Sequence, residues 1–497
     1  MMKQLIGILI IMQFSLGQQT QGGSPYSQLH GLRNIYHTIS LPSVDNDALL
    51  EQDSYREMGT PYRYGFTHQG NYSPENSGIW ELTDDGGMMW QIRFTSEDAF
   101  AISFEYEEFY IPEGGELFVF TPDYEMIQGA YNHLNNREHQ YFSTPLIEGD
   151  VAIIEYYQPA DVKGEFSLII TEIIHDYRDI MNFSGNSRDW ECGVNVICET
   201  DESYQGVINS VAFLDMGAYI CSGAMVNNVR QDLTPYFLTA WHCVDGDNPS
   251  TFRFYFNKEA SSCENTWSSP GPYAYGSDLV AESDGMDSDW ALLLIEDDIE
   301  DAWEVFYAGW DVTGNYPDIS CGIHHPGGSG KKINYDDDPA FGDWWDVCCE
   351  STHWRVNWDE GGTEGGSSGS PLFNDQFRIV GPLSGGPEGE CGESYDLYGK
   401  LSRGWNWEMP MNRRLIDWLD PDYTGTMVID GRYVEVTGIP GDLNSDDTAN
   451  ILDIIALANL ILGDDPTNEE LQLADLNNDG TLNILDIIAL VNIILNS

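Results

Sequence analysis

The sequence predicts a mainly β protein of three domains, of which the last is small and α-helical. Three observations support this fold class. Short apolar or alternating runs separated by turn residues continue to about residue 430, all nine cysteines lie between Cys192 and Cys391, and a loop-plus-helix pattern is duplicated after residue 440. A chain of 497 residues also exceeds the size of one ordinary core.

The N-terminus has the features of a secretory signal. Lys3 is followed by an apolar run from Leu5 to Phe14 and then by small residues ending at Gly17. We expect residues 1–17 to be removed as a signal peptide. This run is too short to cross a bilayer, and no later stretch reaches the roughly 20 apolar residues that a membrane helix needs. The protein is therefore expected to be secreted or associated with the cell surface, with no membrane span.

The charge excludes some functions. Acidic residues outnumber basic ones 82 to 21, for a formal charge of −61, while aromatic residues make up 12% of the chain. The aromatic content is high enough to build cores, so we do not expect disorder. Such a charge repels nucleic acids and anionic membranes, and neither is expected as a partner.

The first domain, residues 18–185, is expected to be a β-sandwich. Runs such as "MWQIRF", "ELFVFT" and "VAIIEYY" are broken by the turn sequences "PEGGE" and "EGD". This spacing is typical of antiparallel strands. The segment contains no cysteine and no evident catalytic cluster.

The second domain, residues 186–432, contains two candidate nucleophiles in the stretch "EGGSSGSP". The G-x-S-x-G pattern of α/β-hydrolases selects Ser367. Residues 366–371, Gly-Ser-Ser-Gly-Ser-Pro, instead resemble the G-D-S-G-G-P loop of chymotrypsin-like proteases, which selects Ser368. An α/β-hydrolase needs a histidine after its serine, but the last histidine of this chain is His353. Ser368 is therefore the predicted nucleophile, with a base that lies upstream.

The base and its partner acid can be located in the same way. A serine hydroxyl attacks only when an imidazole takes its proton, and a buried carboxylate orients that imidazole. His242 in "TAWHC" follows an apolar strand, and Asp289 precedes the apolar strand "WALLLI". The order His242, Asp289, Ser368 is that of chymotrypsin-like proteases.

Several segments of this domain resemble lysyl endopeptidases, a bacterial branch of the chymotrypsin-like serine proteases. The matching segments are "CGVNVIC", "CSGAMVNN", "YFLTAWHC", "SDWALLL", "AGWD", "IHHPGG", "GSSGSP" and "YDLYGKL". The resemblance implies a chymotrypsin-like double β-barrel and a serine endopeptidase that cuts polypeptides after basic residues, lysine first, with no cofactor for catalysis. The first domain, through "IPEGGELFVFTPD" and "EGDVAIIEYY", is similar to the pro-region of that family, so we expect a zymogen.

The resemblance also implies roles for further residues. The backbone N–H groups of Gly366 and Ser368 are expected to form the oxyanion hole, and Asp396 in "DLYG" is expected to bind the basic side chain of the substrate. Gly362 occupies the position of trypsin's specificity aspartate, and Ser384 stands where the family has a histidine. Arginine or broad specificity therefore remains open, as does a catalytically silent, scaffold-attached binding protein on a protease fold.

The junction between the first two domains bears on maturation. Its only basic residues before Cys192 are Arg178 and Arg188, and no lysine occurs from residue 164 to 257. A strictly lysine-specific enzyme could not release itself there, so either it tolerates arginine or another protease matures it. Ser367 occupies the position of the aspartate that captures a new N-terminus in chymotrypsin-like zymogens, and that activation switch is expected to be missing.

By the same resemblance, the expected disulfides are Cys192–Cys391, Cys198–Cys263 and Cys221–Cys243. Cys321, Cys348 and Cys349 remain. A zinc site with His324, His325 and His353 is conceivable, but an exported domain with disulfides favours one more bridge and one free thiol.

A short linker, residues 433–440, precedes a duplicated tail, residues 441–497. Two loops 33 residues apart place oxygen-bearing residues at positions 1, 3, 5, 7, 9 and 12, which is the spacing of a calcium loop. We expect two Ca²⁺ ions, one held by Asp442, Asn444, Asp446, Thr448, Asn450 and Asp453 and the other by Asp475, Asn477, Asp479, Thr481, Asn483 and Asp486.

Each loop is followed by one helix rather than flanked by two, which resembles a type I dockerin. That resemblance implies folding on calcium and docking to a cohesin-type protein. The pairs Ile451-Leu452 and Ile484-Leu485 stand where cellulosomal dockerins often carry Ser-Thr.

Overall fold

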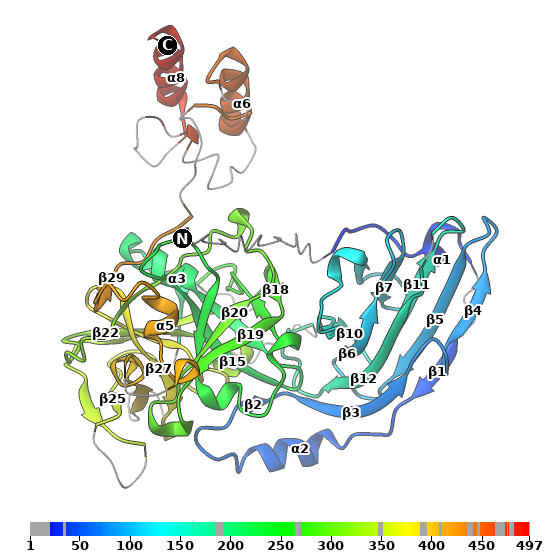
Figure 1. The fold of residues 1–497 in the computed structure, drawn as a ribbon, viewed down its shortest axis with the longest axis horizontal. Helices are drawn as coiled ribbons and strands as arrows, with labels where there is room; N and C mark the ends of the chain where they lie inside the picture. The colour runs from blue at the N-terminus through cyan, green and yellow to red at the C-terminus, as the bar shows by residue number, and fades with distance from the viewer. Residues whose placement is uncertain are drawn as a thin grey trace, which may run out of the picture.

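A computed structural model shows a two-sheet N-terminal region beside a larger β-rich central region, with a small helical module at the C-terminus (Figure 1). The structure describes residues 20–32, 36–162, 164–183, 193–263, 268, 270–345, 351–387, 395–406, 410–434, 441–444, 448–462, 473–474, 476 and 482–496. The predicted signal peptide lies outside these ranges. Within them, no helix is long and apolar enough to cross a lipid bilayer.

The N-terminal region, residues 20–183, is a sandwich of two sheets. One has the strand order β1-β5-β11-β7-β8 with β4 on β5, and the other has the order β10-β6-β12-β3 with β9 on β6. Trp90, Phe94 and Phe104 are fully buried between them. The elements are α1 (Tyr26–Leu29), β1 (His37–Ser40), α2 (Asn46–Asp53), β2 (Tyr62–Arg63), β3 (Gly65–Tyr72), β4 (Ile79–Leu82), β5 (Met88–Thr95), β6 (Ala101–Tyr110), β7 (Glu116–Phe120), β8 (Ile127–Tyr131), β9 (Phe142–Ser143), β10 (Ile147–Glu148), β11 (Val151–Gln158) and β12 (Ser167–Asp176).

The central region, residues 193–434, begins with a sheet of order β18-β17-β14-β15-β16-β20-β19, in which β2 of the N-terminal region pairs with β15. Its two outer strands, β18 and β19, are separated in the chain by Gly276 alone, so the sheet curls into a barrel. The elements are α3 (Gln205–Ser210), β14 (Val211–Asp215), β15 (Tyr219–Val226), β16 (Tyr236–Thr239), β17 (Arg253–Tyr255), β18 (Tyr273–Tyr275), β19 (Ser277–Glu282) and β20 (Ala291–Ile295).

The second sheet of the central region has the order β13-β23-β22-β26-β27-β28-β25-β24. A bridge between Tyr335 on β23 and Glu360, which follows β25, closes it into a second barrel. The elements are β13 (Val194–Asn195), β21 (Gly309–Asp311), β22 (Ser320–His324), β23 (Lys332–Asp336), β24 (Phe341–Asp343), β25 (His353–Val356), β26 (Pro371–Asn374), β27 (Arg378–Gly385), β28 (Asp396–Gly399), α4 (Leu401–Gly404), α5 (Ile416–Leu419) and β29 (Val428–Ile429).

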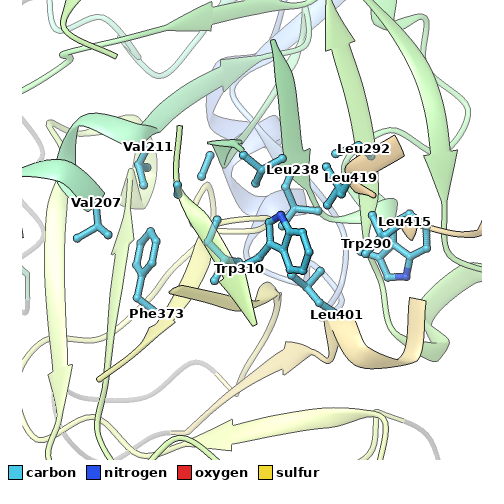
Figure 2. Close-up of a cluster of buried hydrophobic side chains, with 14 of the residues drawn as sticks. Val207, Val211, Leu238, Trp290, Leu292, Trp310, Phe373, Leu401, Leu415 and Leu419 are labelled. Atoms are coloured by element: carbon cyan, nitrogen blue, oxygen red, sulfur yellow. The ribbon is translucent and has the colours of Figure 1, made fainter. Parts of the chain in front are cut away.

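One apolar core joins the two barrels (Figure 2). It combines Leu238 and Leu292 of the first barrel with Trp310 and Phe373 of the second, all buried. Full burial of each such side chain contributes roughly 1.5–3 kcal/mol. This shared core holds the barrels in a fixed orientation, and with them the loops that carry the candidate catalytic residues.

The N-terminal region packs directly on the first barrel. Tyr64 and Ile174 share an apolar cluster with Phe213 and Ile220. Beside this cluster, buried Asp215 accepts hydrogen bonds from Tyr64 Oη at 3.0 Å and from Arg253 Nε at 3.0 Å. Arg253 also donates to the hydroxyl of Ser143 at 2.6 Å and to the carbonyl of Thr144 at 3.1 Å, so buried polar groups of the two regions satisfy one another.

Two residues of the predicted linker, Tyr433 and Val434, pack on the central region. Tyr433 packs edge-on against Phe306 and accepts a hydrogen bond from Asn209, and Val434 lies against the core of the first barrel. Both residues therefore belong to the central region. In the C-terminal module, α6 (Ile451–Leu462) and α8 (Ile484–Asn496) pack together around buried Leu457 and Leu490.

Candidate active site

His242 and Asp289 form a hydrogen-bonded pair at the end of the first barrel. His242 lies in the 3₁₀ turn Trp241–Cys243 that follows β16. Both oxygens of Asp289 bind it, since Oδ1 accepts from the His242 backbone N–H at 3.0 Å and Oδ2 lies 2.8 Å from ring atom Nδ1. Nε2 of His242 is buried and has no hydrogen-bond partner among the described residues. This arrangement places the ring proton on Nδ1 and leaves Nε2 as a proton acceptor.

Asp289 is held in an unusual backbone conformation. Its φ of +43° is in the left-handed region, which a non-glycine residue rarely adopts, and its side chain is fully buried. Such conformations cost of order 1–3 kcal/mol and concentrate at functional sites. The strain positions the carboxylate against the ring of His242.

Ser368 is anchored close to this pair. The carbonyl of Ser368 accepts a hydrogen bond from Ser222 N at 2.8 Å. Cys221, which precedes Ser222, forms a disulfide with Cys243, which follows His242. Gly369 packs so closely on Thr239 and Ala240 that a side chain there would collide with both. Ser368 Oγ makes no hydrogen bond within the described part of the chain, and the residue is 7% exposed.

The loop around Ser368 leaves two backbone donors unused. The N–H groups of Ser367, Gly369 and Ser370 all donate hydrogen bonds within the protein. Those of Gly366 and Ser368 donate none to any described residue. Gly366 has a φ of +96°, and a Cβ there would lie 2.9 Å from the carbonyl oxygen of His325, so the local geometry requires glycine. The two unused donors are those that the sequence assigns to the oxyanion hole.

Ser367 faces away from this site. It is fully buried, and its hydroxyl lies 2.7 Å from Nδ1 of His324. Burial lowers the pKa of His324 to about 4, so this ring is neutral at physiological pH. A substrate cannot reach Ser367, which therefore serves to hold the loop in place.

Asp396 is a buried carboxylate on β28. Its oxygens accept hydrogen bonds from Trp358 Nε1 at 2.6 Å and from Thr363 Oγ1 at 2.8 Å, and burial raises its pKa above the usual range. Gly386 lies against the same carboxylate. No described lysine or arginine pairs with Asp396, so this carboxyl has no counter-charge among the described residues. Trp358 and Thr363, which the sequence analysis did not select, hold this carboxylate in position.

Two of the three expected disulfides lie within the described residues. Cys198–Cys263 and Cys221–Cys243 are both present, with Cα–Cα separations of 5.2 and 6.3 Å. Cys192, Cys391, Cys348 and Cys349 lie outside the described ranges, and Cys321 is a buried free thiol. His324, His325 and His353 bond instead to Ser367, Ser329 and Ser384, respectively.

The C-terminal loops are organised around their last aspartates. Asp453 accepts hydrogen bonds from the N–H groups of Leu443, Asn444 and Asn450, and Asp486 accepts them from Leu476 and Asn483. Both carboxylates are fully buried, Asp442 is 5% exposed, and residues 433–497 contain no lysine, arginine or histidine. Bound cations are the natural compensation for these charges, so the residues present fit Ca²⁺. Asp446, Asp475, Asn477, Asp479 and Thr481 lie outside the described residues.

Comparison with known families agrees with this division of the chain. Residues 185–399 match the family model of the lysyl endopeptidase C-terminal domain, and residues 440–495 match the type I dockerin domain. The central region is thus similar to the lysyl endopeptidase C-terminal domain, and the C-terminal module is similar to a type I dockerin domain. The fold class expected from the sequence, mainly β with a sandwich, two packed barrels and a small helical module, is confirmed by the strand order described above.

A curated relative supports the same assignment. A lysyl endopeptidase of Pseudomonas aeruginosa is 28% identical over 277 residues, which cover 50% of this chain and 57% of that protein. The match thus spans little more than half of the relative. Among solved structures, a serine endoprotease from Yersinia pestis is 14% identical over 40% of this chain and 62% of that one, with a TM-score of 0.29. Kallikrein-related peptidase 10 is 14% identical over 40% of this chain and 92% of that one, with a TM-score of 0.31.

Proposed function

We propose that the chain is a secreted or cell-surface serine endopeptidase that cuts polypeptides after basic residues, lysine in preference to arginine. The observation that carries the proposal is the His242–Asp289 pair beside a serine loop with two unused N–H donors. The buried Asp396 charge, which has no described cationic partner, supports a basic side chain in the substrate.

The proposed chemistry follows from these positions. Ser368 Oγ attacks the substrate carbonyl carbon while Nε2 of His242 takes the hydroxyl proton, and Asp289 stabilises the imidazolium. The carbonyl oxygen becomes an oxyanion, to which Gly366 and Ser368 donate hydrogen bonds; one such donor is worth about 3–4 kcal/mol. The C–N bond then breaks as His242 returns its proton to the leaving amine. Water, deprotonated by His242, hydrolyses the acyl-enzyme.

Digestion of a defined peptide mixture tests the proposal. The processed enzyme should cut on the carboxyl side of lysine and, more slowly, of arginine, because Asp396 would pair with either cation. Mass spectrometry of the products gives the residue before each cut. Cuts after apolar or acidic residues would contradict the proposed role of Asp396, and a complete absence of cleavage would favour the silent binding protein.

We further propose that the dockerin-like module binds two Ca²⁺ ions and attaches the enzyme to a cohesin-type partner. Ile451 and Leu452 at the start of α6 are 69% and 56% exposed, and their counterparts Ile484 and Leu485 at the start of α8 are 61% and 52% exposed. Apolar pairs left exposed at matching positions of both repeats favour a partner with an apolar surface.

Calcium removal provides a prediction for this module. Chelation with EDTA should reduce the helical circular dichroism by about half, because α6 and α8, of 12 and 13 residues, hold about as many residues as the other described α-helices together. Adding Ca²⁺ should restore the signal, and Asp453→Asn should weaken the response. Hydrolysis by the central region should not change, since its core does not include the module. An unchanged spectrum in EDTA would refute the calcium assignment.

A further inference from the structure

A segment of the N-terminal region crosses the candidate active site. We name residues 56–63 the strap. At its C-terminal end, Tyr62 and Arg63 form β2, which pairs antiparallel with Ile220 and Tyr219 of β15. The next two N–H groups, of Tyr64 and Gly65, both donate to the carbonyl of Ala218. In Figure 1, this part of the chain leaves α2 and reaches the central region before it turns back into β3. The paired edge immediately precedes Cys221, whose disulfide partner follows His242.

The middle of the strap lies on both barrels, because Met286 precedes β20 of the first barrel and Trp345 follows β24 of the second. A Cβ added at Gly59 would be 2.8 Å from the ring of Trp345 and 2.9 Å from Met286 Cε, so Gly59 packs directly on both. A Cβ added at Gly385, the last residue of β27, would be 3.8 Å from the backbone nitrogen of Gly59. The strap therefore runs from the end of β27 to the edge of β15, one strand from each barrel.

The C-terminal half of the strap lies against the loop that carries Ser368. The ring of Tyr62 lies against Gly365, where no side chain could be accommodated, and Gly365 precedes the proposed oxyanion donor Gly366. Strap residues line a pocket of about 520 Å³ together with Tyr219, Trp241 and His242, and Ser368 is not among its lining residues. His242 and Ser368 are only 5% and 7% exposed. With the strap in place, little of either side chain is exposed to a substrate.

The strap resembles an extended peptide but lacks the features of a substrate. It contains no lysine, and its two arginines have other partners: Arg56 donates to the carbonyl of Thr60, and Arg63 pairs with Asp53 at 2.7 Å. The described hydrogen-bond partners of the Asp396 carboxylate are Trp358 and Thr363, so no strap side chain occupies it. The strap can thus block the site without being cut.

A buried cluster locks the strap to the end of the sandwich. Arg178 donates three hydrogen bonds from its guanidinium, to Asp53 at 2.6 Å, to the carbonyl of Arg63 at 3.0 Å and to the hydroxyl of Tyr62 at 2.9 Å. The Arg178 side chain is only 9% exposed. Arg178 is one of the two arginines at the junction between the first two domains. Because it is engaged in the fold, it is unsuited to be a cleavage point. The other, Arg188, lies outside the described residues.

We infer that the strap is a built-in inhibitor of this enzyme, which occupies the cleft as an uncut peptide and is locked there by Arg178. The inference rests on the proposed function, because it assigns a regulator to the same site. If the strap inhibits the enzyme, release of the N-terminal region is the activating step. The chain has Ser367 at the position of the aspartate that serves activation in chymotrypsin-like zymogens.

The test measures access to Ser368 in the uncut, full-length chain. A fluorescent diphenyl phosphonate with a lysine-like side chain forms a bond from phosphorus to Ser Oγ and releases phenol, and a gel separates full-length from processed protein. The full-length band of Arg178→Ala and of Tyr62→Ala should be labelled about tenfold faster than that of the wild type, because each substitution removes contacts that hold the strap closed. Arg230→Ala is the matched control, since it breaks an exposed pair with Asp422 that does not touch the strap. It should behave as the wild type.

The outcomes separate the strap from the proposed function. If the wild-type full-length band is labelled as fast as the two variants, and Ser368→Ala abolishes labelling in all of them, the inhibitor role is wrong and the protease stands. If no form of the chain is labelled, the protease proposal fails, and the inhibitor role fails with it. Hydrogen exchange on the wild-type chain covers the case of a misfolded variant. Once phosphonate occupies Ser368, the amides of Tyr64 and Gly65 should exchange faster than before, and unchanged exchange would also overturn the inference.

Discussion

Ser368→Ala is expected to reduce hydrolysis of a lysyl amide substrate by about 10⁵- to 10⁶-fold, the scale seen when a triad serine is removed. The loss follows because His242 would have no hydroxyl to activate, although its pairing with Asp289 would persist. The measurement is kcat/KM of the processed enzyme. Binding should be largely retained, so KM should change much less than kcat.

Ser367→Ala is the matched control for this prediction. Its hydroxyl is buried against His324, and its loss leaves a ring nitrogen without its partner, which costs about 1–3 kcal/mol of stability. We therefore expect a lower melting temperature and a decrease in kcat of less than about tenfold, since the attacking group is untouched. If Ser367→Ala were inactive and Ser368→Ala active, the nucleophile would be Ser367, the serine that the G-x-S-x-G pattern selects.

The candidate site could be predicted from sequence where each residue carries its own local signal. His242 and Asp289 stand at the ends of apolar strands, and the loop around Ser368 is rich in glycine, because a turn with unused N–H donors needs positive φ at Gly366. Chain order then distinguished Ser368 from Ser367. The structure adds that Ser367 is buried, which no pattern in the sequence could show.

The strap could not be predicted in this way. β2 has only two residues, too few to show an alternating pattern, and its partner on β15 lies more than 150 residues further along the chain. The lock depends on Arg178 meeting Asp53 and Tyr62, which are likewise distant in sequence. Trp358 and Thr363 were overlooked for a similar reason, since a tryptophan N–H and a threonine hydroxyl gain their role only by facing Asp396. Contacts of this kind follow from tertiary packing and leave no local signal.

Asp396→Asn is expected to lower kcat/KM for lysyl substrates by about a hundredfold or more, while activity on a substrate with a neutral side chain should be nearly unchanged. The substrate's ammonium group would lose its only described counter-charge, and leaving one member of a buried charge pair unpaired costs about 2–5 kcal/mol. Asparagine can be accommodated, because its oxygen can accept from Trp358 and the Thr363 hydroxyl can rotate to accept from the new amide.

The same substitution should stabilise the protein, and the sign follows from the pKa of Asp396. Burial raises this pKa, so the folded protein holds the proton more tightly than the unfolded chain, and stability is lost as pH rises from the unfolded pKa through the folded one. Above the unfolded pKa the buried carboxyl therefore lowers stability, and Asp396→Asn should melt a few degrees higher than the wild type at neutral pH, with the difference shrinking as pH falls toward the unfolded pKa. Asp336→Asn is the control: burial also raises the pKa of Asp336, to about 6, but the hydrogen bonds of its carboxyl come from the backbone of Asp338 and Asn357 and none joins it to Asp396. It should raise the melting temperature in the same way without changing the preference for lysine. If Asp396→Asn kept the preference for lysine, another group would have to bind the ammonium of the substrate. Substrate recognition would then not explain why the protein keeps a buried carboxyl that lowers its stability.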